Sequence, residues 1–452
     1  MIESCDIAIV GGGPAGQAAA LSLNERGLRV VVIDEQLRPG GQILRQPPRE
    51  FDVGGWMKGR VYAPLRAQLR QFEAAAGIEW WGGRSVLGIA RIAEQGFALT
   101  ISGMDGVQRL SARRVLVAAG SQDLAVPLPG WTLPGVYAAG GIQAFVKSQK
   151  IVPGSRVVLA GTHPLQLLIA AQIVAAGGTV EAVLFAQRRM TMTGHLLRHP
   201  LVAARHAGAL LPAAEAMTLL RRRGVPVHFG VGLKAILGKE CVTGVTSDAG
   251  DMACDTVGLC YGFVPQSALP RMVGARTRPA GPAGGWATDC DPWMRSSVPG
   301  LYVAGETTGV AGAPAAMIEG RIAGAAIAID CDLERTEAAE ARLRSDRREY
   351  RRLLRFAGML DRVADPREYF PAMDNETLVC RCEDVSLGTL QPLIDGASAN
   401  AIKLASRCGM GPCQGRNCEP SLVRLVGDAA DPGFTARFPA RPVSIGDLAA
   451  PR

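Results

Sequence analysis

The 452-residue sequence has few aromatic residues, no N-terminal targeting segment and no long hydrophobic run. Aromatic side chains make up only 5% of it, whereas 55 residues are glycine, and this balance favours helices packed closely on a sheet over a β-sandwich. Residues 1–10 lack the basic, apolar and cleavable regions of a secretory signal, and the apolar stretch at 165–176 is too short to span a bilayer. We therefore expect a cytoplasmic α/β protein.

A strong excess of charge and a histidine-based metal site are also lacking. The 49 basic and 41 acidic residues leave a net charge of +8, which over the whole chain does not indicate a nucleic-acid partner. The five histidines show no metal-ligand spacing, so packing or solvated roles are favoured for them. Arginines concentrated between 342 and 355 predict a basic helix, interpreted as a solvated face with subunit docking as the alternative.

The first candidate site is a glycine-rich turn between an expected strand at 6–10 and a helix that ends near residue 26. Gly11 permits a tight turn, Gly13 lets a pyrophosphate approach the backbone, and Gly16 lets the helix pack closely on the strand. The helix N-terminus at Pro14 and Ala15 directs free N–H groups and the positive end of the helix dipole at phosphates. We predict a dinucleotide-binding βαβ unit; the alternative is a purely structural turn.

The next expected strand, at 28–33, ends on two acidic residues, Asp34 and Glu35. Asp34 follows Gly16 by 18 residues, where a carboxylate can accept hydrogen bonds from the hydroxyls of an adenosine ribose. An acid at this position argues against a 2′-phosphate, and the adjacent Glu35 is expected to share the task. Strand, helix, strand and terminal acid together indicate nucleotide binding.

A second βαβ pattern follows, with strands at 156–160 and 179–185 and a helix at 165–176. Its turn carries His163 and Gln166 where the second and third glycines are expected, and no acid follows the second strand. A histidine side chain would obstruct a pyrophosphate at this point. We interpret this fold as vestigial; the alternative is that it binds a nucleotide differently.

Cysteine is scattered along most of the chain, but five of the 11 cysteines lie between Cys380 and Cys418. In a reducing compartment such a cluster favours a metal site over disulfides. Four thiolates suit either a 2Fe–2S cluster or structural zinc. We interpret Cys380, Cys382, Cys408 and Cys413 as cluster ligands, because the glycines between the last two can fold backbone amides around sulfide. Cys418 is then the spare thiol, on a helix expected to begin directly after Cys413.

Several segments resemble the two-dinucleotide-binding-domain flavoprotein superfamily, over about residues 1–330. The segment at 302–306 is similar to a late motif that contacts the flavin ribityl chain, with Glu306 in place of the usual aspartate. The loop at 39–43, the return strand at 117–120 and the helix region at 312–324 also match. The resemblance implies FAD as cofactor. Beside the first glycine turn, the implied contacts are Gly41, Gln42, Ala119, Gly120, Gly305, Glu306 and Ala313.

The order of these units resembles the α subunits of heteromeric FAD-dependent amine, opine and (hydroxy)proline dehydrogenases, a family that includes subunits of octopine and nopaline oxidases and of hydrogen cyanide synthase. The cysteine module resembles bacterioferritin-associated-ferredoxin-like 2Fe–2S domains. The resemblance implies a separate FAD-containing catalytic β subunit that oxidises a C–N bond. It leaves room for an FMN between subunits and for a small ferredoxin-like γ subunit. A quinone or another acceptor would take the electrons, in the cytoplasm or at the periphery of the inner membrane.

We expect five units: a discontinuous FAD-binding domain (1–120 and 266–332), a degenerate nucleotide-binding-like domain (121–265), a basic helical linker (333–371), a 2Fe–2S domain (372–430) and a tail (431–452). The predicted function is that of an electron-transfer subunit of an oxidoreductase that uses CH–NH donors. No acid–base constellation for C–N cleavage is visible, so no catalytic residue is predicted. Two alternatives stay open: a standalone NAD(P)H-dependent flavin oxidoreductase, and a non-catalytic scaffold that holds FAD and zinc.

Overall fold

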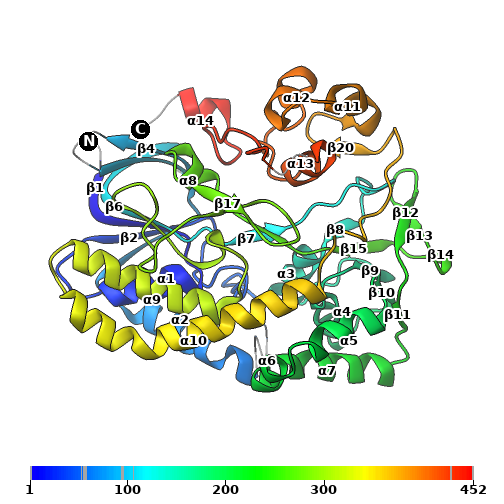
Figure 1. Cartoon of the computed structure of the whole chain (residues 1–452), viewed down its shortest axis with the longest axis horizontal. Helices are drawn as coiled ribbons and strands as arrows, with labels where there is room; N and C mark the ends of the chain where they lie inside the picture. Colours follow the sequence, from blue (N-terminus) through cyan, green and yellow to red (C-terminus); the bar gives the residue numbers. More distant parts are fainter. Residues whose placement is uncertain are drawn as a thin grey trace.

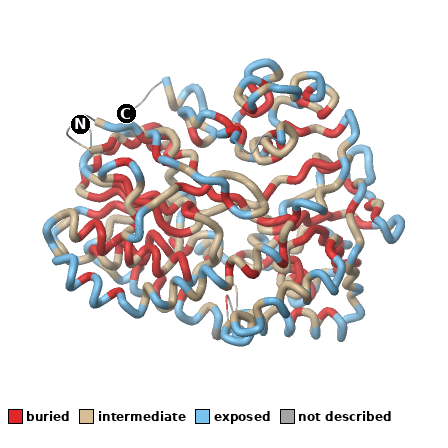
Figure 2. The backbone as a smooth tube through the Cα atoms, viewed as in Figure 1, coloured by how far each residue is buried: buried red, intermediate tan, exposed pale blue. Residues whose placement is uncertain are grey.

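The computed structural model describes residues 3–51, 53, 57, 59–92, 96–104, 106–427 and 430–449. Two α/β units lie side by side, and a small helical module lies above the region between them (Figure 1). Most of the buried residues lie in two groups, one in each α/β unit (Figure 2). No helix in the described part of the chain is long and apolar enough to cross a membrane.

The first unit is built on a mixed sheet. Its strands are β1 (Glu3–Val10), β2 (Val30–Asp34), β3 (Ile78–Gly82), β4 (Ser85–Ile92), β5 (Gly96–Gly103), β6 (Gly106–Val117) and β19 (Leu301–Val303). The order is β3-β2-β1-β6-β5-β4, and the end of β6 also pairs with β19. The central strands are parallel, whereas β4, β5 and β6 form an antiparallel meander. Buried runs of valine and isoleucine in β1 and β2 are typical of parallel strands covered on both faces.

Two helices, α1 (Pro14–Leu23) and α9 (Ala313–Asp330), pack against each other beside this sheet, with α2 (Ala63–Ala74) next to α1. Small residues let α1 and α9 approach closely. A Cβ added at Gly320 would lie 2.1 Å from the carbonyl oxygen of Ala15, and one at Gly324 would lie 2.6 Å from Cβ of Ser22. The start of α1, and with it the glycine turn, is therefore held by direct backbone contact.

The second unit contains a parallel five-stranded sheet in the order β11-β10-β9-β15-β8. Its strands are β8 (Val136–Ala138), β9 (Val157–Gly161), β10 (Val180–Phe185), β11 (Val227–Phe229) and β15 (Thr256–Cys260). Helices α3 (Ala139–Gln149), α4 (Leu165–Ala175) and α7 (Ala207–Arg222) pack around it, and α5 (Arg189–Leu197) and α6 (Pro200–Arg205) follow β10. A meander of β12 (Leu233–Gly238), β13 (Val242–Ser247) and β14 (Gly250–Ala253) adjoins it. The strand–helix–strand pattern expected at 156–185 is thus present as β9, α4 and β10.

Two antiparallel strands, β7 (Ser121–Asp123) and β16 (Phe263–Pro265), connect the two units and pair with each other. We refer to this pair as the hinge. After β16 the chain passes through α8 (Ala268–Met272) and the β17 (Thr277–Pro279) and β18 (Trp286–Thr288) hairpin before it rejoins the first sheet at β19.

A 28-residue helix, α10 (Thr336–Val363), follows α9 and corresponds to the basic helix expected from the sequence. It packs along α9 through its N-terminal part and reaches α5 and α6 of the second unit through its C-terminal part (Figure 1). Ion pairs and hydrogen bonds hold it to the first unit; for example, Arg321 in α9 binds Asp346 with an Nε–Oδ2 distance of 2.7 Å.

The cysteine module consists of β20 (Leu378–Cys380), β21 (Val385–Ser386), α11 (Leu387–Ile394), α12 (Ala399–Ser406) and α13 (Glu419–Val426), and a tail with α14 (Ile445–Ala449) follows it. Ser386 and Ser398 cap α11 and α12 with their hydroxyl groups, which accept from backbone N–H groups. Its small core includes Leu390, Ile402 and Phe434, which pack with buried cysteines. The module therefore depends on its cysteine region for much of its packing.

Candidate functional site

The glycine turn between β1 and α1 has the geometry expected for a phosphate-binding loop. Gly11 has φ +109°, and an added Cβ would lie 2.2 Å from the carbonyl oxygen of Ala118. An added Cβ at Gly16 would lie 1.9 Å from the carbonyl oxygen of Gly11. These two positions require glycine for the turn and for helix–strand packing, as the sequence pattern predicts.

Gly13 differs from its two neighbours in the motif, because an added Cβ there would meet only Cα of Gly41, at 3.7 Å. Gly13 lies directly before α1, with Pro14 and Ala15 in the first turn of the helix. Gly41, in turn, has φ +61°, and its added Cβ would lie 2.8 Å from Cα of Gly13. The two glycines form a cradle of bare backbone at a helix N-terminus, which fits a pyrophosphate.

Asp34 lies at the end of β2 and faces this turn. Its carboxylate accepts from the backbone N–H groups of Gly12 (2.6 Å) and Gln36 (2.7 Å), and burial raises its pKa despite these bonds. A carboxylate has about four acceptor sites, so Asp34 retains capacity for a ribose hydroxyl. Glu35 points elsewhere, because it forms an ion pair with Arg441 of the tail.

The late motif lies beside the start of α1. Gly305 has φ +70°, and its added Cβ would lie 2.9 Å from Cβ of Ala15. Glu306 accepts a 2.5 Å hydrogen bond from the Ser121 hydroxyl, and burial raises the pKa of its carboxyl group. Ala313 begins α9 next to the same segment, and Gly120 precedes Ser121 after Ala119 at the end of β6. The structure thus brings Asp34 and the predicted FAD residues of the glycine turn, of the segments at 41–42, 119–120 and 305–306, and of the start of α9 to one end of the first sheet.

Two ionisable residues near this region were not predicted from the sequence. Glu319 in α9 is only 2% exposed and accepts from the N–H group of Gly305 (2.6 Å) and the hydroxyl of Tyr350 (2.5 Å). Burial raises its pKa to about 7. Lys147 in α3 donates to the carbonyl oxygen of Gln42 (2.5 Å), and burial lowers its pKa to about 8. The sequence signal for Glu319 was a carboxylate within the apolar part of this helix, where only Arg321 carries another charge before Asp330 at the end.

The nucleotide position of the second unit is occupied by the chain itself. The hydroxyl of Thr162, just after β9, donates to the carbonyl oxygen of Ala364 at 2.8 Å. The amide of Gln187, just after β10, donates to the carbonyl oxygens of Thr162 (2.9 Å) and Val363 (3.0 Å). Val363 and Ala364 end α10, so a helix C-terminus with its negative dipole end occupies the strand ends where nucleotides bind in such sheets.

His163 also helps to fill the nucleotide position of the second unit. Its ring nitrogen Nδ1 accepts from the N–H group of Leu165 (3.2 Å), and its ring packs edge-on against Phe263 of the hinge, with 5.1 Å between centroids. Burial lowers its pKa to about 4, so the imidazole is neutral at physiological pH. A neutral, packed histidine and a helix C-terminus leave no phosphate-binding group at this turn within the described residues.

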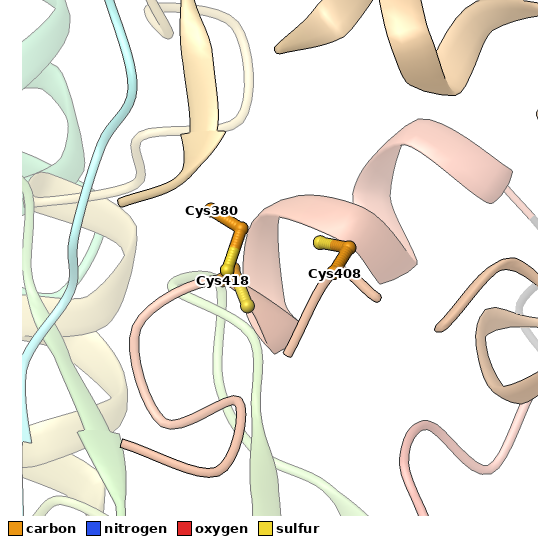
Figure 3. A group of neighbouring side chains, drawn as sticks. All are labelled: Cys380, Cys408 and Cys418. Atoms are coloured by element: carbon orange, nitrogen blue, oxygen red, sulfur yellow. The ribbon is translucent and has the colours of Figure 1, made fainter. Parts of the chain in front are cut away.

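The five clustered cysteines form two groups. The Sγ atoms of Cys380, Cys408 and Cys418 lie within 4.8 Å of one another and are buried (Figure 3). Cys382 and Cys413 form a second group, in which their side chains hydrogen-bond each other. Gly409 donates its N–H to the sulfur of Cys380 at 3.4 Å, and Gly411 approaches Cys382 so closely that an added Cβ would lie 2.3 Å from its Cβ.

The prediction of a helix that begins directly after Cys413 is wrong, because α13 begins only at Glu419. Gln414 and Gly415 have φ values of +53° and +84°, and the left-handed backbone excludes a helix there. Gly415 instead wraps the loop around Phe434, whose ring lies 2.4 Å from the position of an added Cβ. This turn carries Cys418 back to Cys380, which is why the thiol interpreted as spare lies within the buried group.

One contact joins the cysteine module to the first unit near the flavin-type motifs. The Nε2 of Gln122 donates to the carbonyl oxygen of Arg416 (2.6 Å), and the Nε of Arg416 donates to Oε1 of Gln122 (3.0 Å). Gln122 is the neighbour of Ser121, the partner of Glu306, and Arg416 lies between Cys413 and Cys418. Adjacent residues of β7 therefore contact both candidate sites.

Two nucleotide-type folds joined by a two-stranded hinge, with an intact glycine turn on the first fold, define a flavoprotein of the two-dinucleotide-fold class. Residues 5–328 match the model of the pyridine nucleotide-disulphide oxidoreductase family. The chain belongs to this family and is a flavoprotein oxidoreductase. The family also implies FAD, which the open cradle at Gly13 and Gly41 fits.

Individual proteins that resemble the chain give a more specific comparison than the family model does. The chain is 33% identical over 463 residues to the opine oxidase A subunit of Rhizobium meliloti (strain 1021), with 98% of both chains covered. It is 32% identical over 460 residues to hydrogen cyanide synthase subunit HcnB of Pseudomonas protegens, with 96% of this chain and 95% of that protein covered. The solved structure of L-proline dehydrogenase from P. horikoshii is similar in fold, with a TM-score of 0.69 at 22% identity, over 100% of this chain and 81% of the other. The predicted fold class, α/β with two Rossmann-like folds and a small cysteine-rich domain, is confirmed.

Proposed function

We propose that this chain is the FAD- and 2Fe–2S-containing electron-transfer subunit of a heteromeric dehydrogenase for amines, opines or imino acids. A separate FAD-containing β subunit oxidises the substrate, and this chain passes the electrons to a quinone or another acceptor. The names of the relatives, which are subunits of an opine oxidase and of a hydrogen cyanide synthase, support a partner subunit. An FMN between subunits and a small γ subunit are compatible with this assembly.

The observation that carries the proposal is the contact of β7 with both candidate redox sites. Ser121 binds Glu306 at the flavin-type end, and Gln122 binds Arg416 in the cysteine loop. Electron transfer slows steeply with distance, so a relay needs its two centres close together and held in place. The contacts from neighbouring residues of one strand support such an arrangement.

The closed second nucleotide fold supports an electron source other than NAD(P)H. Carbonyl oxygens from the end of α10 receive the side chains of Thr162 and Gln187 at the strand ends. A pyridine nucleotide would have to displace these buried hydrogen bonds, each of which costs about 1–3 kcal/mol when a buried partner is left unsatisfied. The alternative of a standalone NAD(P)H-dependent reductase is therefore disfavoured.

The residues predicted for FAD have distinct tasks in this proposal. Gly13 and Gly41 expose backbone to the pyrophosphate, and Asp34 accepts from the ribose. Glu306 would accept from a ribityl hydroxyl, and the N-terminus of α9 at Ala313 would stabilise negative charge on the flavin. Bound FAD supplies a centre that takes up and releases one or two electrons.

The cysteine geometry suits the two-plus-two ligation of a 2Fe–2S cluster, in which each iron takes two thiolates. Cys382 and Cys413 supply one pair, and Cys380 supplies one thiolate of the other. Cys408, the ligand interpreted from the sequence, and Cys418 compete for the last position. We favour Cys418, because the left-handed turn at Gln414 and Gly415 brings its thiol into the buried group beside Cys380.

Cofactor analysis of the purified full chain is the first test. We expect one FAD, two irons with acid-labile sulfide and no bleaching of the flavin by NADH or NADPH. Zinc in place of iron would support the scaffold alternative, and rapid bleaching by either nucleotide would support the reductase alternative.

Reconstitution with the β subunit is the second test. The chain alone should not reduce a dye with proline, opines, glycine or sarcosine, whereas the complex should do so with one of these substrates. Amine oxidation by the chain alone would overturn the relay assignment.

A further inference from the structure

A cleft lies between the cysteine module, the hinge region and the C-terminal tail, and it shares Gln122 and Arg416 with the contact described above. Its volume is about 70 Å³, and the rings of Trp286 and Phe434 line part of it. Its cationic lining residues come from α8, α12, the cysteine loop and the tail. They are Arg271, Lys403, Arg416, Arg437 and Arg441.

The described lining residues contain a single acidic side chain, Glu419, and it is already engaged. Its Oε1 accepts from Arg271 at 3.0 Å and from the N–H group of Phe434 at 2.7 Å. Arg441 is held from outside the cleft by Glu35. The remaining cations give the cleft a strong positive potential that nothing in its described lining balances.

Lys403 is the residue that points to a ligand. It is only 8% exposed, and its Nζ lies 4.6 Å from the centroid of the Phe434 ring. Within the described chain this ammonium has no hydrogen-bond acceptor. The stem of the side chain is buried, but the Nζ atom itself keeps access to the cleft, and the contact with the Phe434 ring replaces only part of its hydration. Its position on the cleft wall leaves an anion in the cleft as the natural partner.

We infer that this cleft binds a phosphate group, either free or as the monoester of an organic ligand. A phosphate carries up to two negative charges and three terminal oxygens, which several guanidinium groups and one ammonium satisfy better than a singly charged carboxylate does. The amide of Gln266 also lines the cleft, and its N–H groups offer a further donor, while its oxygen accepts from Arg441. The indole of Trp286 gives an organic portion a surface on which to pack.

Isothermal titration calorimetry on the full chain with its cofactors tests this site, with inorganic phosphate and phenyl phosphate as separate probes. We expect saturable 1:1 binding that weakens as the salt concentration rises. Lys403→Met keeps the length and the contact with Phe434 but removes the charge, and should weaken binding at least tenfold. Lys239→Met, at an exposed position in the second unit, is the matched control and should bind as the wild type does.

Two additions keep the test decisive if Lys403→Met unfolds the module. Arg437→Gln lies at an exposed tail position and should weaken phosphate binding severalfold, while Lys403→Arg should restore most of the affinity. Tighter binding of phenyl phosphate than of inorganic phosphate would indicate a monoester as the ligand, and equal affinity would indicate free phosphate. Absence of saturable binding by either probe, equal affinity in wild type and both charge-removing variants, or preference for an acidic peptide would overturn the inference.

Discussion

Replacing Glu319 by glutamine should change how the stability of the protein depends on pH. Burial raises the pKa of this carboxyl group from 4.5 to about 7, against the opposing effect of hydrogen bonds from Tyr350, Thr308 and Gly305. In the unfolded chain the group titrates near its ordinary value. Between pH 4.5 and 7 the folded state therefore binds more protons than the unfolded state, and stability falls as the pH rises through this window.

The size of the effect follows from the two pKa values. A displacement from 4.5 to about 7 corresponds to about 3 kcal/mol of folding free energy at alkaline pH. Most of this, between about 2 and 3 kcal/mol, is lost between pH 5 and pH 8. Glutamine preserves the shape and an acceptor for the N–H group of Gly305 but cannot ionise, so the variant should not lose this contribution.

Urea unfolding of wild type and Glu319→Gln at pH 5 and pH 8, followed by tryptophan fluorescence, measures the difference. We expect the variant to gain between about 2 and 3 kcal/mol relative to wild type on going from pH 5 to pH 8. Glu340→Gln, at an exposed position of α10, is the control and should follow the wild type. Parallel pH profiles for wild type and Glu319→Gln would refute the assignment of a raised pKa to this residue.

Three further predictions concern the candidate sites. Gly13→Ala should fold but purify without FAD, because its methyl group enters the cradle opposite Gly41, whereas Gly358→Ala, in open space on α10, should retain FAD; a flavin spectrum distinguishes them. Replacement of Cys380, Cys382, Cys413 or Cys418 by serine should remove the electron paramagnetic resonance signal of the reduced cluster, whereas Cys408→Ser should keep it. If the signal instead survives in Cys418→Ser and is lost in Cys408→Ser, the ligands are the four cysteines predicted from the sequence. Gln187→Leu should destabilise the chain by about 2 kcal/mol, because two buried carbonyl oxygens lose a donor. The variant should not oxidise NADH, and rapid NADH oxidation by it would contradict the proposal that the second nucleotide fold is closed to nucleotides.

The glycine turn was predictable because its requirements are local. Gly11 and Gly16 are needed by contacts within the turn itself and with the adjacent return strand, and the strand–helix–strand order reveals them. The departure of the second fold from the nucleotide-binding pattern was also visible, since His163 stands where a glycine is expected. That the end of α10 fills this fold was not predictable, because Ala364 and Thr162 are distant in the sequence and no periodicity links them.

The cysteine region shows a different limit. The spacing of the five cysteines revealed a metal-type cluster but did not reveal which thiols meet. That depends on left-handed backbone at Gln414, a residue with no strong preference for it, and on Phe434, which lies beyond the cysteine region. The proposed exchange of Cys408 for Cys418 rests on these long-range features.

The course of α10 has a mechanical consequence. The hinge strands alone would form a narrow connection, about which the two α/β units could rotate. Helix α10 is fastened to the first unit at Asp346 and Tyr350 and to the second through the carbonyl oxygens of Val363 and Ala364. Helix α10 therefore restrains rotation about the hinge. We expect the molecule to behave as one rigid body that presents the same geometry to a partner protein at every encounter.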